Sequence, residues 1–286
     1  MLSINPSDIS TSKLHGYLLS SVAPRPIALA STVDAEGSVN LSPFSFFNVF
    51  SANPPILIFS PSRRVVKNTI KHTLNNVLAT KEVVINMVNY EIVQQMSLSS
   101  SEYAQGVNEF VKAGFTMLAS EKVKPFRVAE SPIQLECKVN EIVALGNEGG
   151  AGNLIICEVV KLHIKRAFIN NNGTINQKKL DLVARAGGSY YSRAKEGFFE
   201  IEKPSSVLGI GVDVIPYKIR NSTVLTGNDL GMLGNVKEIP SENDVNKFAK
   251  EHTQYVGLDL VKKHTFAKVF LEKNDAIGAW KVLLMK

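Results

Sequence analysis

The sequence predicts a mainly β protein, a β-barrel with short helices, followed by a C-terminal extension. Residues 133–139 alternate between apolar and polar side chains, which is the period of a strand with one buried face. A second long apolar run, at 153–165, follows a glycine-rich loop, and two long strands joined in this way suit a barrel wall better than a βαβ unit. A hairpin pattern at 26–33 and 38–43 predicts another antiparallel pair near the N-terminus.

Shorter elements are expected between these strands. The segment DAEG at 34–37 is a turn signal that closes the first hairpin. Apolar runs predict two further strands, at 56–60 and 82–88. Helical segments are expected at 62–72, with Ser62 as N-cap, at 91–98 and at 106–112. The segment NNNG at 170–173 predicts a turn after the second long strand.

The character of the chain changes near Pro204, and we place a domain boundary after this residue. Residues 1–204 form the expected barrel domain, and residues 205–286 form an extension that packs on the barrel or on a partner subunit. Two stretches of the extension have a helical composition: 245–250, preceded by the helix-start signal Ser241 and Asp244, and 265–284, which Gly278 weakens.

The bulk composition is that of an ordinary globular protein. Of 286 residues 44% are apolar and 20% charged, so the chain can bury a substantial core. The net charge is +6, but the basic residues are dispersed, which favours a solvated surface with mild attraction for anions over a nucleic-acid interface. Cys137 and Cys157 lie in apolar strand-like runs, so we expect buried free thiols. The N-terminus lacks a secretory signal, and the cytoplasm is the expected compartment.

Several familiar catalytic and cofactor motifs are missing. The segment GIG at 209–211 lacks the third glycine and the βαβ context of a Rossmann fingerprint. No Walker motif and no G-x-S-x-G elbow occurs. The five histidines are scattered, without a metal-ligand spacing. We therefore assign no catalytic side chain and no metal ligand.

The most informative stretch is 23–48, APRPIALASTVDAEGSVNLSPFSFFN. Pro24 and Pro26 flank Arg25 and fix the backbone before the first strand. Residues 42–48 then place backbone N–H groups, two serine hydroxyls and an asparagine amide between flat apolar side chains. This combination suits a flat heteroaromatic ligand with polar edges.

With later segments, this stretch resembles the flavin reductase-like family of FMN-binding split-barrel proteins. The segments that carry the resemblance are PRPIALAST (24–32), SPFSFFN (42–48), PPILIFS (54–60), KNT (67–69), EFVKAGF (109–115), RAGGSYY (185–191) and GIGVDVIPYKIRNSTVLTGNDLGMLGN (209–235). The resemblance covers roughly residues 10–235. It implies an FMN-binding split β-barrel, and a homodimer with its flavin sites at or near the subunit interface.

Three parts of a flavin site are assigned on this basis. The ring-edge residues are Ser42, Pro43, Phe44, Ser45, Phe47 and Asn48. The phosphate residues are Ser60, Ser62, Lys67, Asn68 and Thr69, where a helix beginning at Ser62 offers free N–H groups and Lys67 lies one turn inside it, with Arg25 as a further anion contact. The residues that approach the flavin or the nicotinamide cofactor are Arg185 and Gly188. Each assignment has a structural alternative: aromatic residues of the core, a capped surface helix with solvated charges, and an ordinary glycine turn.

The resemblance implies electron transfer from NAD(P)H through FMN to an acceptor, which is free flavin, a ferric complex or a partner monooxygenase. Because a flavin carries the redox chemistry itself, the lack of a catalytic triad is consistent with this function. Two alternatives stay open. One is a flavin-carrying redox protein without its own NAD(P)H reaction, and the other is a non-catalytic FMN-binding module.

Overall fold

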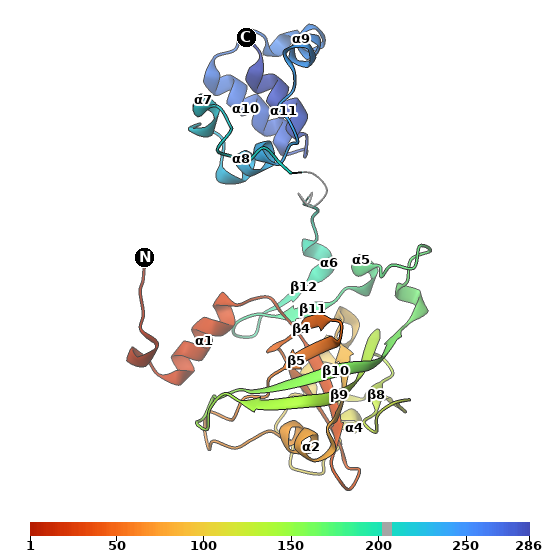
Figure 1. Ribbon diagram of the computed structural model, residues 1–286. Helices are drawn as coiled ribbons and strands as arrows, with labels where there is room; N and C mark the ends of the chain where they lie inside the picture. The colour runs from red at the N-terminus through yellow and green to blue at the C-terminus, as the bar shows by residue number, and fades with distance from the viewer. Residues whose placement is uncertain (202–207) are drawn as a thin grey trace. The chain divides into compact units, whose positions relative to one another are not determined.

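The computed structural model describes residues 1–201 and 208–286, which form two compact units, Met1–Phe199 and Glu200–Lys286 (Figure 1). The first unit is built on β-strands with short helices, as predicted. The described regular elements of the second unit are helices, so the fold is mixed α/β rather than mainly β. The domain boundary predicted between residues 204 and 205 lies outside the described residues.

A seven-stranded antiparallel sheet is the frame of the first unit, in the order β3-β2-β6-β9-β10-β5-β4. Its strands are β2 (Ala28–Val33), β3 (Val39–Phe44), β4 (Phe47–Ala52), β5 (Pro55–Phe59), β6 (Glu82–Met87), β9 (Ile133–Ala144) and β10 (Asn153–Ile164). The predicted N-terminal hairpin is the β2–β3 pair, and the two long predicted strands pair along their whole length. Each of the strands predicted from the sequence therefore lies in this one sheet.

Smaller elements surround the sheet. A three-stranded sheet has the order β1-β11-β12, and β7 pairs with β8. The strands are β1 (Arg25–Pro26), β7 (Met117–Leu118), β8 (Arg127–Val128), β11 (Val183–Arg185) and β12 (Tyr191–Arg193). The helices are η1 (Pro6–Asp8), α1 (Thr11–Ser21), α2 (His72–Thr80), η2 (Tyr90–Ile92), α3 (Val93–Leu98), α4 (Glu109–Ala113), η3 (Arg166–Phe168), α5 (Gln177–Leu180) and α6 (Ala194–Gly197).

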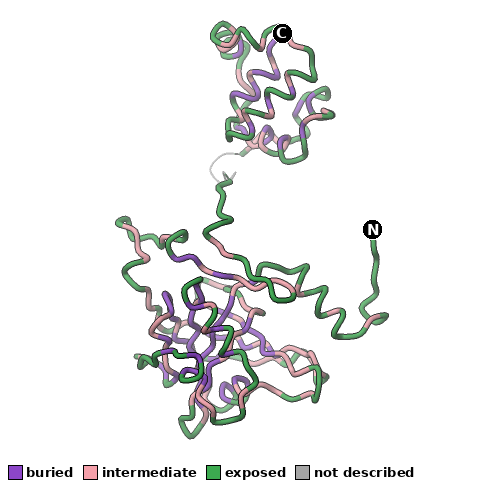
Figure 2. The backbone as a smooth tube through the Cα atoms, turned by 180° about the vertical axis from the view of Figure 1, so that it is seen from behind, coloured by how far each residue is buried: buried purple, intermediate pink, exposed green. Residues whose placement is uncertain are grey.

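The core of the first unit lies on both faces of β2, whose residues are all buried. Figure 2 shows the buried residues gathered in the interior of this unit. Because side chains alternate along a strand, Ala28 and Ala30 join one apolar cluster with Phe59 and α2. Leu29 joins a second cluster with residues of α3 and α4, including Phe110. Cys137 and Cys157 are buried free thiols in the first cluster, as expected.

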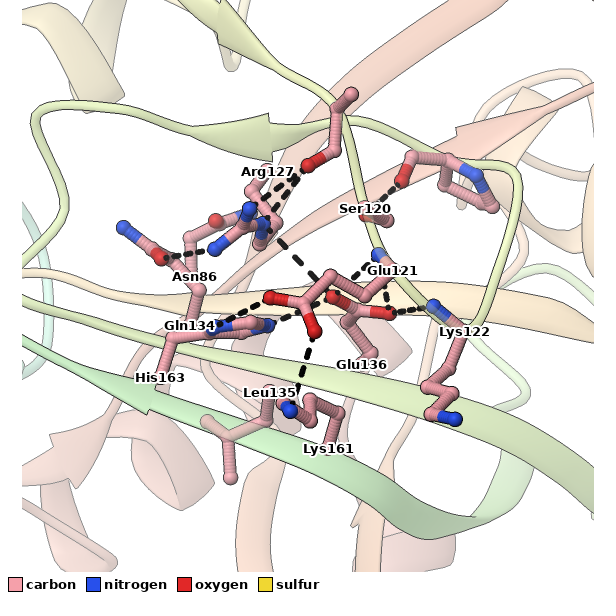
Figure 3. A network of polar contacts seen from close by, with 12 residues as sticks. Asn86, Ser120, Glu121, Lys122, Arg127, Gln134, Leu135, Glu136, Lys161 and His163 are labelled. Atoms are coloured by element: carbon pink, nitrogen blue, oxygen red, sulfur yellow. Dashed lines mark hydrogen bonds and ion pairs between the residues drawn. The ribbon is translucent and has the colours of Figure 1, made fainter.

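The polar face of β9 differs from the prediction of a half-buried strand. Gln134 and Glu136 are buried, with Glu136 showing 0% exposure, whereas Leu135 between them is only partly buried. The segment between β7 and β8 covers this face, because the backbone N–H groups of Glu121 and Lys122 donate to the Glu136 carboxylate (Figure 3). A local pattern of alternating polarity does not reveal a covering segment that comes from elsewhere in the chain.

The prediction of a helix at 62–72 is wrong. The residues before His72 form a loop, and the helix α2 begins only at His72. Lys67 and Asn68 have φ values of 73° and 49°, a left-handed conformation that no right-handed helix accommodates. The helix expected at 91–98 is present as η2 followed directly by α3, and the helix expected at 106–112 is present but shorter, as α4.

The second unit holds α7 (Tyr217–Arg220), α8 (Gly227–Gly234), α9 (Glu242–Glu251), η4 (Thr253–Tyr255), α10 (Leu260–Leu271) and α11 (Ala276–Leu284). Ser241 and Asp244 form a capping box at the start of α9, so the predicted helix start is confirmed. The helix predicted at 265–284 is two helices, because Asn274 is left-handed and Asp275 caps a new helix. Trp280 lies fully buried in the apolar cluster of this unit. Among the described helices, none has the length and hydrophobicity needed to span a membrane.

Candidate functional site

The connection between β3 and β4 carries the ring-edge residues predicted from the sequence. Ser42 and Pro43 lie on β3, opposite residues of β2. Phe44 is 8% exposed, and its ring packs against Phe59 with the ring centres 5.5 Å apart, so it is a core residue. Ser45 is half-buried at the connection, and Phe47 begins β4. The stretch therefore combines one core aromatic residue with accessible polar groups.

Asn48 lies at the edge of the seven-stranded sheet. It is an exposed residue of the edge strand β4, and its Oδ1 accepts a hydrogen bond from the backbone N–H of Val49 at 2.8 Å. An exposed amide is accessible to a ligand, so the assignment of Asn48 to the ring edge stays a prediction. Val49 and Phe50, the next residues of the strand, are 62% and 63% exposed.

Ser60 connects the ring-edge stretch to the predicted phosphate residues. Its backbone N–H donates to the carbonyl of Phe46 at 2.8 Å, and the residue is 8% exposed. Within the described part of the chain, its Oγ has no hydrogen-bond partner. A buried hydroxyl without a partner is costly, so this atom is suited to a hydrogen bond with a ligand. A Cβ atom at Gly152 would lie 2.6 Å from the same Oγ, so only a glycine can pack directly against this hydroxyl.

The predicted phosphate residues lie in a loop that hydrogen bonds between its own residues stabilise. Arg63 donates through Nη2 to the carbonyl of Asn68 at 2.8 Å, and Arg64 donates through Nη1 to Oγ1 of Thr69 at 3.1 Å. The Asn68 amide donates to the carbonyl of Asn147 at 2.9 Å. Asn68 and Thr69 therefore shape the loop, and Ser62 stands at its start without capping a helix.

A second loop, at 146–152, supports the first. The backbone N–H of Arg63 donates to the carbonyl of Ala151 at 2.8 Å, and the N–H of Gly150 donates back to Arg63 at 3.0 Å. A Cβ at Gly149 would lie 2.7 Å from the carbonyl oxygen of Val65, so only glycine allows this approach. The sequence predicts this glycine-rich loop but not its support of the first loop, which the glycine density beside a long strand could have indicated.

The electrostatics of the paired loops favour an anion. Arg63, Arg64, Lys67 and Lys71 all lie in or next to the first loop, and Glu102 is the acidic residue that pairs there, with Arg64 at 2.8 Å and Lys71 at 3.7 Å. The hydrogen bond and charge of Arg64, and then the charge of Lys71, lower the pKa of Glu102. Lys67 is exposed, and no carboxylate of the described residues pairs with it. The loop retains a positive excess.

Arg25 and Arg185 are brought together on the small sheet, where they are register partners on β1 and β11. Arg25 is 6% exposed and donates to the carbonyls of Leu19 and Val22 at the end of α1. Its Nε also contacts Oγ of Ser45 at 3.5 Å, which links this pair to the ring-edge stretch. Gly188 lies at an exposed turn after β11, with a φ of 56°. The predicted residues thus form two groups that meet at the β3–β4 connection.

The first unit is similar to known proteins in sequence and in structure. The family model described as "Flavin reductase like domain" matches residues 19–179. An uncharacterized protein of Aquifex aeolicus is 38% identical over 181 residues, which are 63% of this chain and 90% of that protein. The segment 209–235, which carried part of the predicted resemblance, lies beyond the family match and within the second unit.

Solved structures of other proteins are also similar to this chain. The nitrilotriacetate monooxygenase component B of Bacillus cereus superposes with a TM-score of 0.65 at 28% identity, over 71% of this chain and 98% of that one. The 2-nitrobenzoate 2-nitroreductase NbaA of Pseudomonas fluorescens gives 0.65 at 25% identity, over 73% and 100%. A putative flavin reductase with a split-barrel domain from Shewanella frigidimarina shares the fold, with 0.58 at 23% identity over 71% and 98%. With the family model matched over more than half of its length, this chain belongs to the flavin reductase-like family, and its first unit is a split barrel.

Proposed function

We propose that the chain binds FMN and passes electrons from NAD(P)H through it to an acceptor. The observation that carries this proposal is the position of Ser60. Its buried hydroxyl, which has no partner among the described residues, stands between the β3–β4 connection and a loop with excess positive charge. A ligand with a polar planar ring and a phosphate matches that order of groups.

The residues present fit FMN. Backbone N–H groups and hydroxyls from Ser42 to Phe47 would face the polar edge of the ring, and Ser60 would donate to it. The phosphate would lie at the loop of Ser62, Lys67, Asn68 and Thr69, held by charge and backbone N–H groups rather than by a helix N-terminus. When bound, FMN supplies the redox chemistry, while the chain binds and orients it.

A homodimer is part of the proposal. The edge strand β4 exposes Val49 and Phe50, and all eleven residues of α1 are at least partly exposed, among them Leu18 at 50%. An apolar edge strand and an uncovered helix are both liabilities in a monomer. A second copy of the chain would cover both and lie close to the ring-edge stretch.

The acceptor is proposed by analogy with relatives. One similar structure is a monooxygenase component and another is a nitroreductase. A partner monooxygenase or a small molecule is therefore a better candidate for the acceptor than a ferric complex.

The test is an absorbance experiment on the full-length protein. Purified protein reconstituted with FMN and freed of excess ligand should be yellow, and anaerobic NADH or NADPH should bleach it rapidly. A yellow protein that neither donor bleaches would be a flavin carrier fed by another reductase. A protein that does not retain FMN would contradict the cofactor assignment itself.

A further inference from the structure

The small sheet of the first unit carries two arginines and a tyrosine in one row. Arg25 of β1 pairs in register with Arg185 of β11, and Arg185 pairs with Tyr191 of β12. Directly opposed side chains of antiparallel strands lie on the same face of a sheet. The guanidinium carbon of Arg185 lies 4.7 Å from the centre of the Tyr191 ring, so these two side chains are in cation–π contact.

The charges of this row are not compensated. Both guanidinium groups donate to carbonyl oxygens, those of Leu19, Val22 and Ala186 for Arg25, and those of Ala186 and Tyr190 for Arg185. Among the described residues, no carboxylate pairs with either arginine. Burial and then the charge of Arg185 lower the pKa of Arg25, as expected for neighbouring cations. Such a pair is stabilised when an anion binds beside it.

The two arginines differ in what they can offer a ligand. Arg25 is 6% exposed, and each of its guanidinium nitrogens has an acceptor, so it holds α1, the turn after β11 and Ser45 in place. Arg185 is half-buried, and only its Nη1 donates to described residues. Beyond it, a Cβ at Gly188 would meet nothing within 4 Å, so the space next to this turn is open.

We propose that Arg185 binds the oxyanion group, a phosphate or a carboxylate, of the substrate that exchanges at the flavin site. The inference rests on the proposed function and deepens it. A guanidinium offers a planar fork that matches a phosphate or carboxylate, and the Tyr191 ring holds that fork in position. Arg25 is a positioning residue, because its contact with Ser45 joins the row to the ring-edge stretch. The oxyanion comes from the phosphates of the nicotinamide dinucleotide or from a carboxylate on the acceptor.

The experiment compares the FMN-loaded full chain with Arg185→Gln and Arg185→Lys. Lys178→Gln is the matched control, because it removes the same charge from an exposed position on α5. The measurements are kcat and KM for NADH and NADPH, the same constants for a carboxylate-bearing acceptor such as nitrobenzoate, inhibition by inorganic pyrophosphate at constant ionic strength, and the Kd of FMN. Bound FMN would occupy the loop around Lys67, so inhibition by pyrophosphate would report on anion binding at Arg185.

In Arg185→Gln we expect the KM of the donor and the inhibition constant of pyrophosphate to rise about tenfold to a hundredfold, with kcat within about twofold and the Kd of FMN unchanged. Arg185→Lys should recover part of the loss, because it keeps the charge without the fork. A rise confined to the KM of the nitrobenzoate acceptor would support the proposal with the acceptor as the source of the oxyanion.

Two results would overturn the proposal. One is a set of constants indistinguishable from those of Lys178→Gln, and the other is a weaker Kd for FMN with unchanged substrate constants. If the parent protein neither retains FMN nor oxidises NAD(P)H, the proposed function has failed. Calorimetric titration with pyrophosphate in a Lys67→Ala background, which weakens the competing anion site of the loop, then still decides on Arg185, since equal affinity with and without Arg185→Gln rejects the oxyanion site.

Discussion

Oε1 of Glu136 on β9 lies 2.7 Å from Nε2 of His163 on β10, and Glu136 has no exposed surface (Figure 3). The same carboxylate accepts hydrogen bonds from the backbone N–H groups of Glu121 and Lys122, and Nε of Arg127 lies 3.8 Å away. This single side chain thus fixes the segment between β7 and β8 to the sheet. A buried carboxylate with charged and backbone partners is costly to remove, because its partners stay behind.

Glu136→Ala should therefore lower the free energy of unfolding of the first unit by about 3–5 kcal/mol, and Glu136→Gln by about 1–3 kcal/mol. Glu121→Gln is the control, because that side chain is 51% exposed and solvent screens its ion pair with Lys161. Urea unfolding of the first unit is monitored through the fluorescence of released FMN or through circular dichroism in the strand region. The one tryptophan, Trp280, lies in the helical unit and should report an unchanged transition. Equal losses for Glu136→Gln and Glu121→Gln would show that the buried network carries no special stability.

The same carboxylate predicts an acid dependence. Burial raises the pKa of Glu136, but the N–H groups of Glu121 and Lys122 and the His163 side chain outweigh it, and the net pKa lies below the ordinary value of 4.5. A carboxyl with a lowered folded-state pKa stabilises the fold above its unfolded pKa and loses this contribution as pH falls through the folded value. The first unit should lose stability progressively below pH 4.5, with a shallower slope in Glu136→Gln. Unfolding midpoints measured from neutral pH to about pH 3 test this, and parallel curves would remove Glu136 from the explanation.

Ser60→Ala should separate stability from binding. Because Oγ of Ser60 has no partner in the described residues, its removal should leave the apoprotein as stable as before or more stable by about 1 kcal/mol. FMN affinity should fall by roughly threefold to tenfold, the worth of one hydrogen bond. Ser131→Ala is the control, since its Oγ contacts two carbonyls at 2.8 Å and its loss should destabilise the fold. A destabilised Ser60→Ala apoprotein with parental FMN affinity would make Ser60 a purely structural residue.

Lys67→Ala should weaken FMN binding by about tenfold to a hundredfold, the value of a charge-assisted contact. Lys81→Ala is a close control, because Lys81 is also an exposed lysine with a left-handed backbone, at φ 58° against 73° for Lys67. Both variants lose one positive charge, and both place an alanine at a left-handed backbone position, which has a similar conformational cost. Fluorescence titration with FMN at matched salt gives the two dissociation constants, and equal constants would identify Lys67 as a solvated surface residue.

The sequence predicted the strands well, because strand periodicity and turn signals are local. It predicted the loop before α2 as a helix because Ser62 is a residue type that commonly caps a helix. The bonds that decide its structure come from Ala151 and Gly150, which are distant in sequence, and they compete with the helix. The pairing of Arg25 with Arg185 likewise joins residues far apart in the chain, so no local pattern contains it.

Gly149→Ala tests whether the two loops act together. A Cβ at this position would lie 2.7 Å from the carbonyl oxygen of Val65 and 3.1 Å from that of Arg64, and backbone atoms have little freedom to give way. The change should push the loops apart and move Lys67 and its neighbours, while the sheet keeps its core. We expect FMN affinity to fall by at least about tenfold, with the unfolding of the apoprotein changed by about 1–3 kcal/mol. Gly16→Ala is the control, since a Cβ there meets nothing within 4 Å and helix propensity favours alanine in α1. If Gly149→Ala keeps the FMN affinity of the parent protein, the loop at 146–152 does not contribute to FMN binding. The anion site would then depend on the residues around Lys67 alone.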